Sequence, residues 1–171
     1  MQKRKRPELF LEIARLLKNH APDQFKFIMA GAFYDDYEAR LKTLAQHYNL
    51  ENDLTFTGFV NDPQKILAGF DILIAPAENE AFGRVLVEAM ALGVPVIASK
   101  SGGHVEIIED GKTGFLCTPD EAQSFADKVI TLQNDAALKE RITEAALAES
   151  KKYEASEIAR RFEEIYEGVL S

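Results

Sequence analysis

Apolar positions along the chain follow two different spacings. Leu9, Ile13 and Leu17 recur every four residues, which is typical of a helix with one buried face. Between such segments lie short, nearly continuous apolar runs, and the run FDILIAP has the pattern of a strand buried on both faces. These runs predict five strands, over residues 25–31, 54–58, 70–76, 94–99 and 114–118.

The segments between the apolar runs are predicted to be helices. The first begins at Pro7, a residue favoured at helix starts, and ends at the stretch NHAPD. In a later helix, Asp62 precedes Pro63 and is a candidate cap. The remaining helices are predicted over residues 35–50, 62–70, 82–93, 121–133, 135–150 and 156–170.

Strands and helices therefore alternate with short connections between them. This order predicts an α/β fold, with a Rossmann-like parallel sheet that carries helices on both faces. The 171 residues suit one domain, covering 1–171 and ending in helices from about residue 135.

Composition excludes several classes of protein. The net charge of -8 does not fit a nucleic-acid-binding groove. Cys117 is the only cysteine, so no intrachain disulfide or thiol-based zinc site can form, and the cytoplasm is the expected location. His20, His47 and His104 have no metal-binding spacing and are interpreted as surface or satisfied polar residues. No signal peptide and no apolar run of membrane-spanning length are present.

The stretch PAENEAFGRVLVEAM lies where a binding site is expected. The loop 75–80 leaves the carboxyl end of a buried strand, the edge at which open parallel sheets bind ligands. Phe82 and Gly83 begin the next helix, where unpaired backbone N–H groups suit a phosphate. Arg84 either adds positive charge there or faces solvent.

Two glutamates flank this helix start. Neither Glu80 nor Glu88 would attract a phosphate, but carboxylates accept hydrogen bonds from hydroxyl groups. The pair therefore suits a nucleotide sugar, which carries hydroxyls on both sides of a diphosphate. In the alternative interpretation, Glu80 only complements the helix dipole and Glu88 belongs to a solvated helix face.

The stretch EAFGRVLVEAMALGVPVIAS, followed by SGGHVEIIEDGKTGFL, resembles the C-terminal half of glycosyltransferase family 4. The resemblance extends from about Lys5 to Pro119. It implies one half of a GT-B fold, in a retaining enzyme that transfers a hexose-type sugar from a nucleotide-diphosphate donor. The acceptor would be a glycan or a lipid-linked molecule. No cofactor besides this donor is expected, and no metal, because the chain has no D-x-D triplet.

The resemblance also implies roles for individual residues around the transferred sugar. Glu80 corresponds to the first glutamate, which lies close to the sugar, and is the candidate catalytic residue. Phe82 and Gly83 correspond to a step whose backbone amides meet sugar or phosphate. Lys5 corresponds to a lysine that meets the diphosphate.

Further roles concern the nucleoside end of the donor. Glu88 corresponds to the second glutamate, which binds the ribose hydroxyls, and Val60 to a turn beside the nucleobase. Gly102 and Gly103 correspond to a loop that either contacts the ligand or forms a tight turn before a helix.

The sequence departs from the family at its beginning. In the family this half starts with a strand that ends in a Gly-Arg step, and the stretch MQKRKR does not match that strand. We therefore expect a sheet that lacks its first strand and shows a gap or a rearrangement. The acceptor-binding half is also missing, so the chain alone is not expected to turn over substrate. That half could bring the protein to a membrane surface.

Two alternatives stay open from sequence alone, and a third is excluded. A GT-B sugar-nucleotide epimerase would share the fold, although usually not the Phe-Gly pair between the glutamates. A dinucleotide-binding module would need a G-x-G-x-x-G motif, which the chain lacks. A non-catalytic interaction domain could use the charged helices over residues 135–170 to bind a partner.

Overall fold

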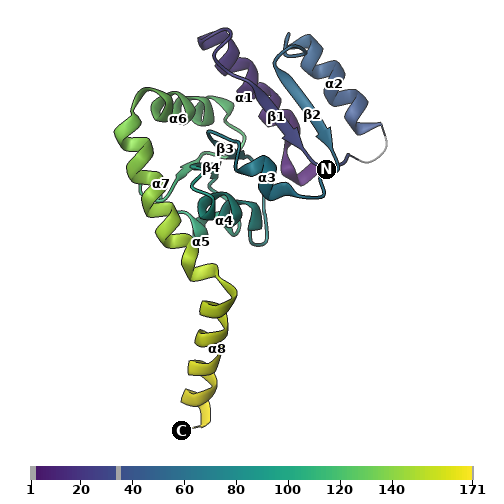
Figure 1. The fold of residues 1–171 in the computed structure, drawn as a ribbon. Coiled ribbons are helices and arrows are strands. Elements are labelled where there is room, and N and C mark those ends of the chain that lie inside the picture. Colours follow the sequence, from purple (N-terminus) through teal and green to yellow (C-terminus); the bar gives the residue numbers. More distant parts are fainter. Residues whose placement is uncertain (1–2, 34–35, 171) are drawn as a thin grey trace.

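The computed structural model describes residues 3–33 and 36–170 (Figure 1). Asp35, where the second helix was expected to begin, lies outside them. The strands are β1 (Phe27–Ala30), β2 (Leu54–Gly58), β3 (Leu73–Ala75), β4 (Val96–Ser99) and β5 (Phe115–Cys117). The α-helices are α1 (Pro7–His20), α2 (Tyr37–His47), α3 (Pro63–Leu67), α4 (Arg84–Ala91), α5 (His104–Ile107), α6 (Ala122–Asn134), α7 (Ala136–Ser150) and α8 (Ala155–Leu170). Two short 3-10 helices are η1 (Lys3–Lys5) and η2 (Lys151–Tyr153).

All five predicted strands are present and all their ladders are parallel. They form two sheets, one with the order β1-β2 and the other with the order β3-β4-β5. The α/β class and the alternation of strands and helices are therefore confirmed. The single sheet is not observed, because within the described residues no ladder joins β1 to β3.

The strand β4 separates two hydrophobic cores. All four of its residues are buried, as its apolar sequence predicts for a strand covered on both faces. Ile97 packs into the core that contains residues of α1 and α6, whereas Val96 and Ala98 pack into the core that contains residues of α4. Helices therefore cover both faces of the β3-β4-β5 sheet.

A cavity lies at the interruption between β1 and β3. Ile28 and Met29 of β1 and Leu73 and Ile74 of β3 all line the same cavity. The expected gap in the sheet is thus present between these two strands. The edges of β1 and β3 that face it make no ladder with another described strand.

Element boundaries differ from the sequence prediction mainly at the ends of strands and at α4. The strand β3 is shorter than the apolar run 70–76, because the Phe70 N–H is still hydrogen-bonded to the Leu67 carbonyl of α3 and Asp71 forms a bend. The helix α4 begins at Arg84 rather than Phe82. The preceding residue, Gly83, has a φ of 85°, which lies in the left-handed region. Glycine adopts this conformation readily, but a right-handed helix cannot continue through it.

Two loops at the carboxyl ends of β3 and β4 are in close contact. The Gly103 N–H donates a hydrogen bond of 2.7 Å to the Glu80 carbonyl, and the Asn79 N–H donates one of 3.1 Å to Ser101 Oγ. A Cβ atom at Gly103 would lie 2.6 Å from the Ala81 carbonyl oxygen. The Gly102-Gly103 pair is therefore required by the contact between these loops, the second of which leads into α5.

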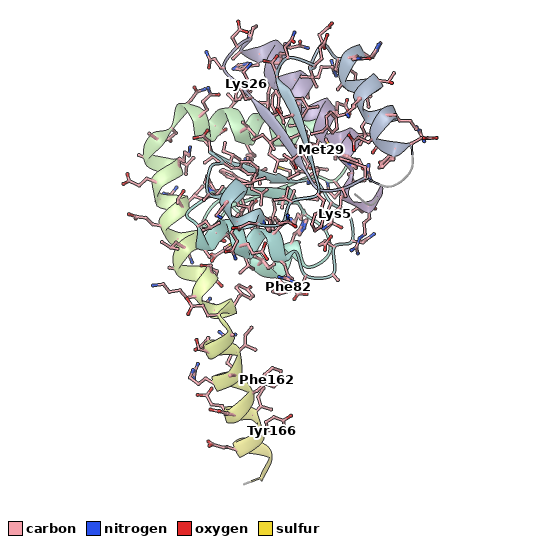
Figure 2. The ribbon with its side chains drawn as sticks, turned by 45° about the vertical axis from the view of Figure 1, so that its right-hand side comes forward. Lys5, Lys26, Met29, Phe82, Phe162 and Tyr166 are labelled. Carbon is pink, nitrogen blue, oxygen red and sulfur yellow. The ribbon has the colours of Figure 1, made fainter. Side chains whose placement is uncertain are left out.

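The helix α8 projects away from the rest of the chain (Figure 1). Its apolar residues Ile158, Phe162, Ile165 and Tyr166 are exposed and follow a helical spacing, and Figure 2 labels Phe162 and Tyr166 on this helix. Across the described residues, none of the helices combines the length and the apolar character needed to cross a membrane.

The gap between β1 and β3 predicts a marginally stable chain. The facing edges of β1 and β3 make no ladder with another described strand, and each backbone group left both buried and unpaired costs about 1–3 kcal/mol. Thermal unfolding followed by circular dichroism should give a midpoint within the ordinary range for mesophilic domains. A cooperative transition of the monomer above about 70 °C, beyond that range, would contradict this expectation.

Replacing Gly103 by alanine should separate the two loops. The added Cβ meets backbone atoms of Ala81 and Phe82 at 2.6–3.0 Å, so the free energy of unfolding should fall by about 1–3 kcal/mol, as for other overpacked sites. Gly69→Ala is the matched control, because its Cβ would lie 3.5 Å from the nearest atom. Urea unfolding of both variants measures the difference. Equal stability of the two variants would show that the loops separate without cost.

Candidate functional site

A cavity of about 600 Å³ opens at the carboxyl ends of β1 and β3. Its walls include Gly31 after β1 and the segment 75–77 after β3. It continues into the gap between the two sheets, so the interior is largely apolar, whereas its charged residues are Arg4, Lys5 and Glu80. Lys5 and Met29, both part of the lining, are labelled in Figure 2. This is the edge of the sheet at which the sequence predicts a binding site.

Four of the seven predicted site residues line this cavity: Lys5, Val60, Glu80 and Gly83. They come from η1, from the loop after β2, from the loop after β3 and from the residue preceding α4. Phe82, Arg84 and Glu88 are not part of the lining. The fold thus brings together residues that lie up to 78 positions apart in the sequence.

Lys5 and Glu80 form an ion pair at the wall of the cavity. Lys5 Nζ donates a hydrogen bond of 2.7 Å to Glu80 Oε2, and the Glu80 side chain is 12% exposed. Burial raises the pKa of Glu80, but the hydrogen bond and the positive charge of Lys5 outweigh this effect, so that the pKa lies below its ordinary value. At neutral pH the site therefore holds one ammonium and one carboxylate in contact.

Backbone and side-chain contacts hold the segment that carries Lys5. The Glu78 N–H donates a hydrogen bond of 2.9 Å to the Arg4 carbonyl, and Arg6 Nη1 donates one of 2.8 Å to Glu78 Oε2. The N-terminal segment is therefore attached to the loop that also carries Glu80. Lys5 and Glu80 stay close because their two backbones are joined.

Gly83 places the N-terminus of α4 at the cavity. The backbone N–H groups of the first turn of a helix lack intrahelical partners and carry the positive end of the helix dipole. Val85, in this first turn, also lines the cavity. The arrangement can accept an anionic group beside Lys5.

Glu88 lies one turn beyond Val85 on α4. Residues three positions apart share a side of a helix, so Glu88 follows Val85 away from the cavity mouth. Arg84 Nη2 donates a hydrogen bond of 3.3 Å to Glu88 Oε1, and their side chains are 84% and 28% exposed, respectively. The contact of Glu88 with a ribose and that of Arg84 with a phosphate stay predictions.

The Phe82 side chain points to another part of the molecule. Its ring meets the ring of Tyr153 edge to face, with centroids 5.7 Å apart, and Tyr153 Oη donates a hydrogen bond of 3.2 Å to the Glu106 carbonyl. The role predicted for Phe82 concerns its backbone amide, which precedes Gly83, and this role stays a prediction.

His104, which the sequence suggests is a surface or satisfied polar residue, lines the cavity. It is 1% exposed, and its Nδ1 lies 3.1 Å from the Ser99 carbonyl oxygen. Burial lowers the pKa of His104, while the hydrogen bond to Ser99 and the charge of Glu80 oppose this effect only in part, so the net pKa lies below the ordinary value. The sequence signal that could have placed His104 in the site is its position directly after Gly102-Gly103, in the loop at the carboxyl end of a buried strand.

The part of the chain that the structure describes contains no cluster of three His, Cys, Asp or Glu side chains suited to a metal ion. Cys117 is buried at the end of β5, and burial raises the pKa of its thiol to about 11. The groups that the cavity offers to a ligand are the cations of Arg4 and Lys5, the carboxylate of Glu80, the imidazole of His104 and the backbone N–H groups at the start of α4.

Comparison with known proteins identifies the family. Residues 1–149 match the family described as glycosyl transferases group 1. N-acetyl-alpha-D-glucosaminyl L-malate synthase of Bacillus anthracis is 34% identical over 128 residues, which cover 74% of this chain and 34% of that protein. The chain spans about a third of the length of the curated relatives that it matches.

Solved structures of the family have the same fold. The crystal structure of Anabaena Alr3699/HepE in complex with UDP and glucose aligns with a TM-score of 0.87 and 30% identity, over 98% of this chain and 46% of that chain. The C-terminal domain of the glycosyl transferase group 1 family protein LpcC from Francisella tularensis aligns with a TM-score of 0.79 and 29% identity, over 91% of this chain and 83% of that chain. The chain therefore belongs to the glycosyl transferases group 1 family, and its fold is that of the C-terminal domain of GT-B glycosyltransferases.

Proposed function

We propose that the chain is the donor-binding domain of a retaining glycosyltransferase that takes a hexose-type sugar from a nucleotide diphosphate. The observation that carries the proposal is the Lys5–Glu80 pair of 2.7 Å, which lies in a cavity that Gly83 at the start of α4 also lines. One cation, one carboxylate and free backbone N–H groups match a diphosphate joined to a sugar. The crystal structures of Anabaena Alr3699/HepE in complex with UDP and with UDP-glucose support this assignment.

Each part of the donor has a proposed position. The diphosphate lies between Lys5 and the N-terminus of α4, and the transferred sugar lies at Glu80. The ribose lies toward Glu88, and the nucleobase beside Val60. Three of these four contacts, Lys5, Glu80 and Val60, come from residues that line the cavity.

The transfer step breaks the bond between the anomeric carbon and a diphosphate oxygen. Negative charge then develops on the leaving diphosphate, and Lys5 and the α4 amides stabilise it from fixed positions. The acceptor hydroxyl oxygen forms its bond on the face of the sugar that the diphosphate leaves, and its proton passes to the departing diphosphate oxygen. This retaining outcome rests on the resemblance to family 4. Neither a metal ion nor a further cofactor is part of the proposal.

The acceptor is proposed to be a glycan or a lipid-linked molecule. Because the chain spans about a third of its curated relatives, we assign acceptor binding to a separate domain of a longer protein. The family match favours a transferase over the epimerase alternative.

Replacing Lys5 by methionine should weaken the binding of UDP and UDP-glucose alike. One charge-assisted hydrogen bond to the diphosphate contributes about 1.5–3 kcal/mol, which corresponds to roughly a tenfold loss of affinity or more. Lys100→Met is the matched control, because Lys100 is exposed and is not part of the cavity lining. Isothermal titration calorimetry measures both. Unchanged affinity of Lys5→Met for both ligands would remove Lys5 from the diphosphate site.

Replacing the two glutamates should separate sugar binding from nucleotide binding. Glu88→Ala should weaken UDP and UDP-glucose equally, by about 2–3 kcal/mol for two hydrogen bonds to the ribose. Glu80→Ala should weaken the binding of UDP-glucose only. Loss of the Glu80 carboxylate should slightly tighten the binding of UDP, because Lys5 loses its partner. Calorimetry with both ligands distinguishes the two, with Glu140→Ala on α7 as the charge control. If both variants lose the same affinity for both ligands, the glutamates support the loop and do not contact the ligand.

A further inference from the structure

His104 is a buried, titratable residue of the cavity that the proposed binding of the donor does not yet use. Its ring lies directly against Gly83: a Cβ atom added at Gly83 would come within 3.0 Å of His104 Cδ2 and 3.4 Å of Nε2. The imidazole therefore occupies the space beside the start of α4 that the missing side chain leaves. Glu80 and Lys5 line the same cavity, and their charges act on His104.

The contact with Ser99 determines which ring nitrogen carries the proton. A carbonyl oxygen only accepts hydrogen bonds, so Nδ1, at 3.1 Å from the Ser99 oxygen, carries the hydrogen. In the neutral ring Nε2 is then an acceptor, and the neutral form is favoured by burial and by the positive charge of Lys5. Within the described residues, no protein group forms a hydrogen bond with Nε2.

The chemistry of an acceptor decides which part of the donor can lie there. Diphosphate oxygens are themselves acceptors and would be repelled by the Nε2 lone pair, whereas Lys5 and the α4 amides can donate to them. Sugar hydroxyls can donate. His104 lines the same cavity as Glu80, the proposed sugar contact, so a sugar hydroxyl is the group assigned to Nε2.

We propose that Nε2 of His104 accepts a hydrogen bond from a hydroxyl of the transferred sugar, so that His104 recognises the sugar together with Glu80. This inference rests on the proposed function, since it requires a sugar nucleotide in the cavity. Nδ1 fixes the ring through Ser99, and Nε2 contacts the ligand. A buried site that hydrogen-bonds a hydroxyl discriminates against an analogue without it, because the acceptor is then left unpaired.

Two substitutions separate the two nitrogens. His104→Asn retains an amide N–H near the position of Nδ1, so the contact with Ser99 can persist, but it has no atom at the position of Nε2. His104→Gln carries an amide oxygen that can reach the position of Nε2 and accept in its place. His47→Asn on α2 is the matched control, because His47 is exposed and outside the cavity lining.

Calorimetry of this chain and its variants with UDP and UDP-glucose tests the inference. His104→Asn should bind UDP as the wild type does and UDP-glucose about three- to tenfold more weakly, the loss of one uncharged hydrogen bond. His104→Gln should restore most of the affinity for UDP-glucose, and His47→Asn should change nothing. Equal affinities of the wild type and His104→Asn for UDP-glucose, or an equal loss for both ligands, would overturn the inference, with water then the partner of Nε2.

Monodeoxy analogues of UDP-glucose provide a measurement that does not depend on one variant. Compared with UDP-glucose, the analogue that lacks the partner hydroxyl should bind more weakly to the wild type and to His104→Gln. It should bind to His104→Asn as tightly as UDP-glucose does. If no analogue shows this coupling, the inference is wrong. If the wild type binds no nucleotide diphosphate and no nucleotide-diphosphate hexose, UDP and UDP-glucose included, the proposed function itself fails, which distinguishes that result from a failure of His104 alone.

Discussion

The hydrogen bond from the Gly103 N–H to the Glu80 carbonyl, 2.7 Å long, joins the two loops on which the candidate site depends. The loops approach this closely because Gly102 and Gly103 have no side chains, and Cβ atoms at either position would collide with the backbone around Glu80. The same contact brings Glu80 to Lys5 on one side and leads directly into His104 on the other. Gly102 and Gly103 thereby determine how close Lys5, Glu80 and His104 lie to one another.

The positions of the loops follow from the parallel pairing of β3 and β4. Parallel neighbours end at the same edge of a sheet, so the loops that follow them meet there. Because β4 is buried on both faces, with α1 and α6 contributing to one core and α4 to the other, this edge is supported from both sides. The part of the site on the loop after β2 has no comparable support, because β1 and β3 are not paired.

The sequence predicted the class of fold, all five strands and the loop that carries Glu80, because periodicity and apolar runs are local signals. It also predicted the gap, although the division into two sheets depends on contacts between distant segments. Lys5 and Glu80 are 75 positions apart, and no local pattern indicates that they form an ion pair. The interpretation of His104 as a satisfied polar residue agrees with its contact to the Ser99 carbonyl, but its place in the cavity was not predicted, because one histidine in a sequence does not show what surrounds it.

The Lys5–Glu80 pair has a consequence for the order in which ligands leave. In the proposed function, an intact donor gives each partner a replacement, the diphosphate for Lys5 and the sugar for Glu80. Once the sugar has been transferred, only the diphosphate has a partner, and the carboxylate competes with it for the ammonium group at 2.7 Å. In the proposed function, Glu80 thus acts as a counterion to Lys5 once the sugar has been transferred, and this competition favours release of the nucleotide diphosphate.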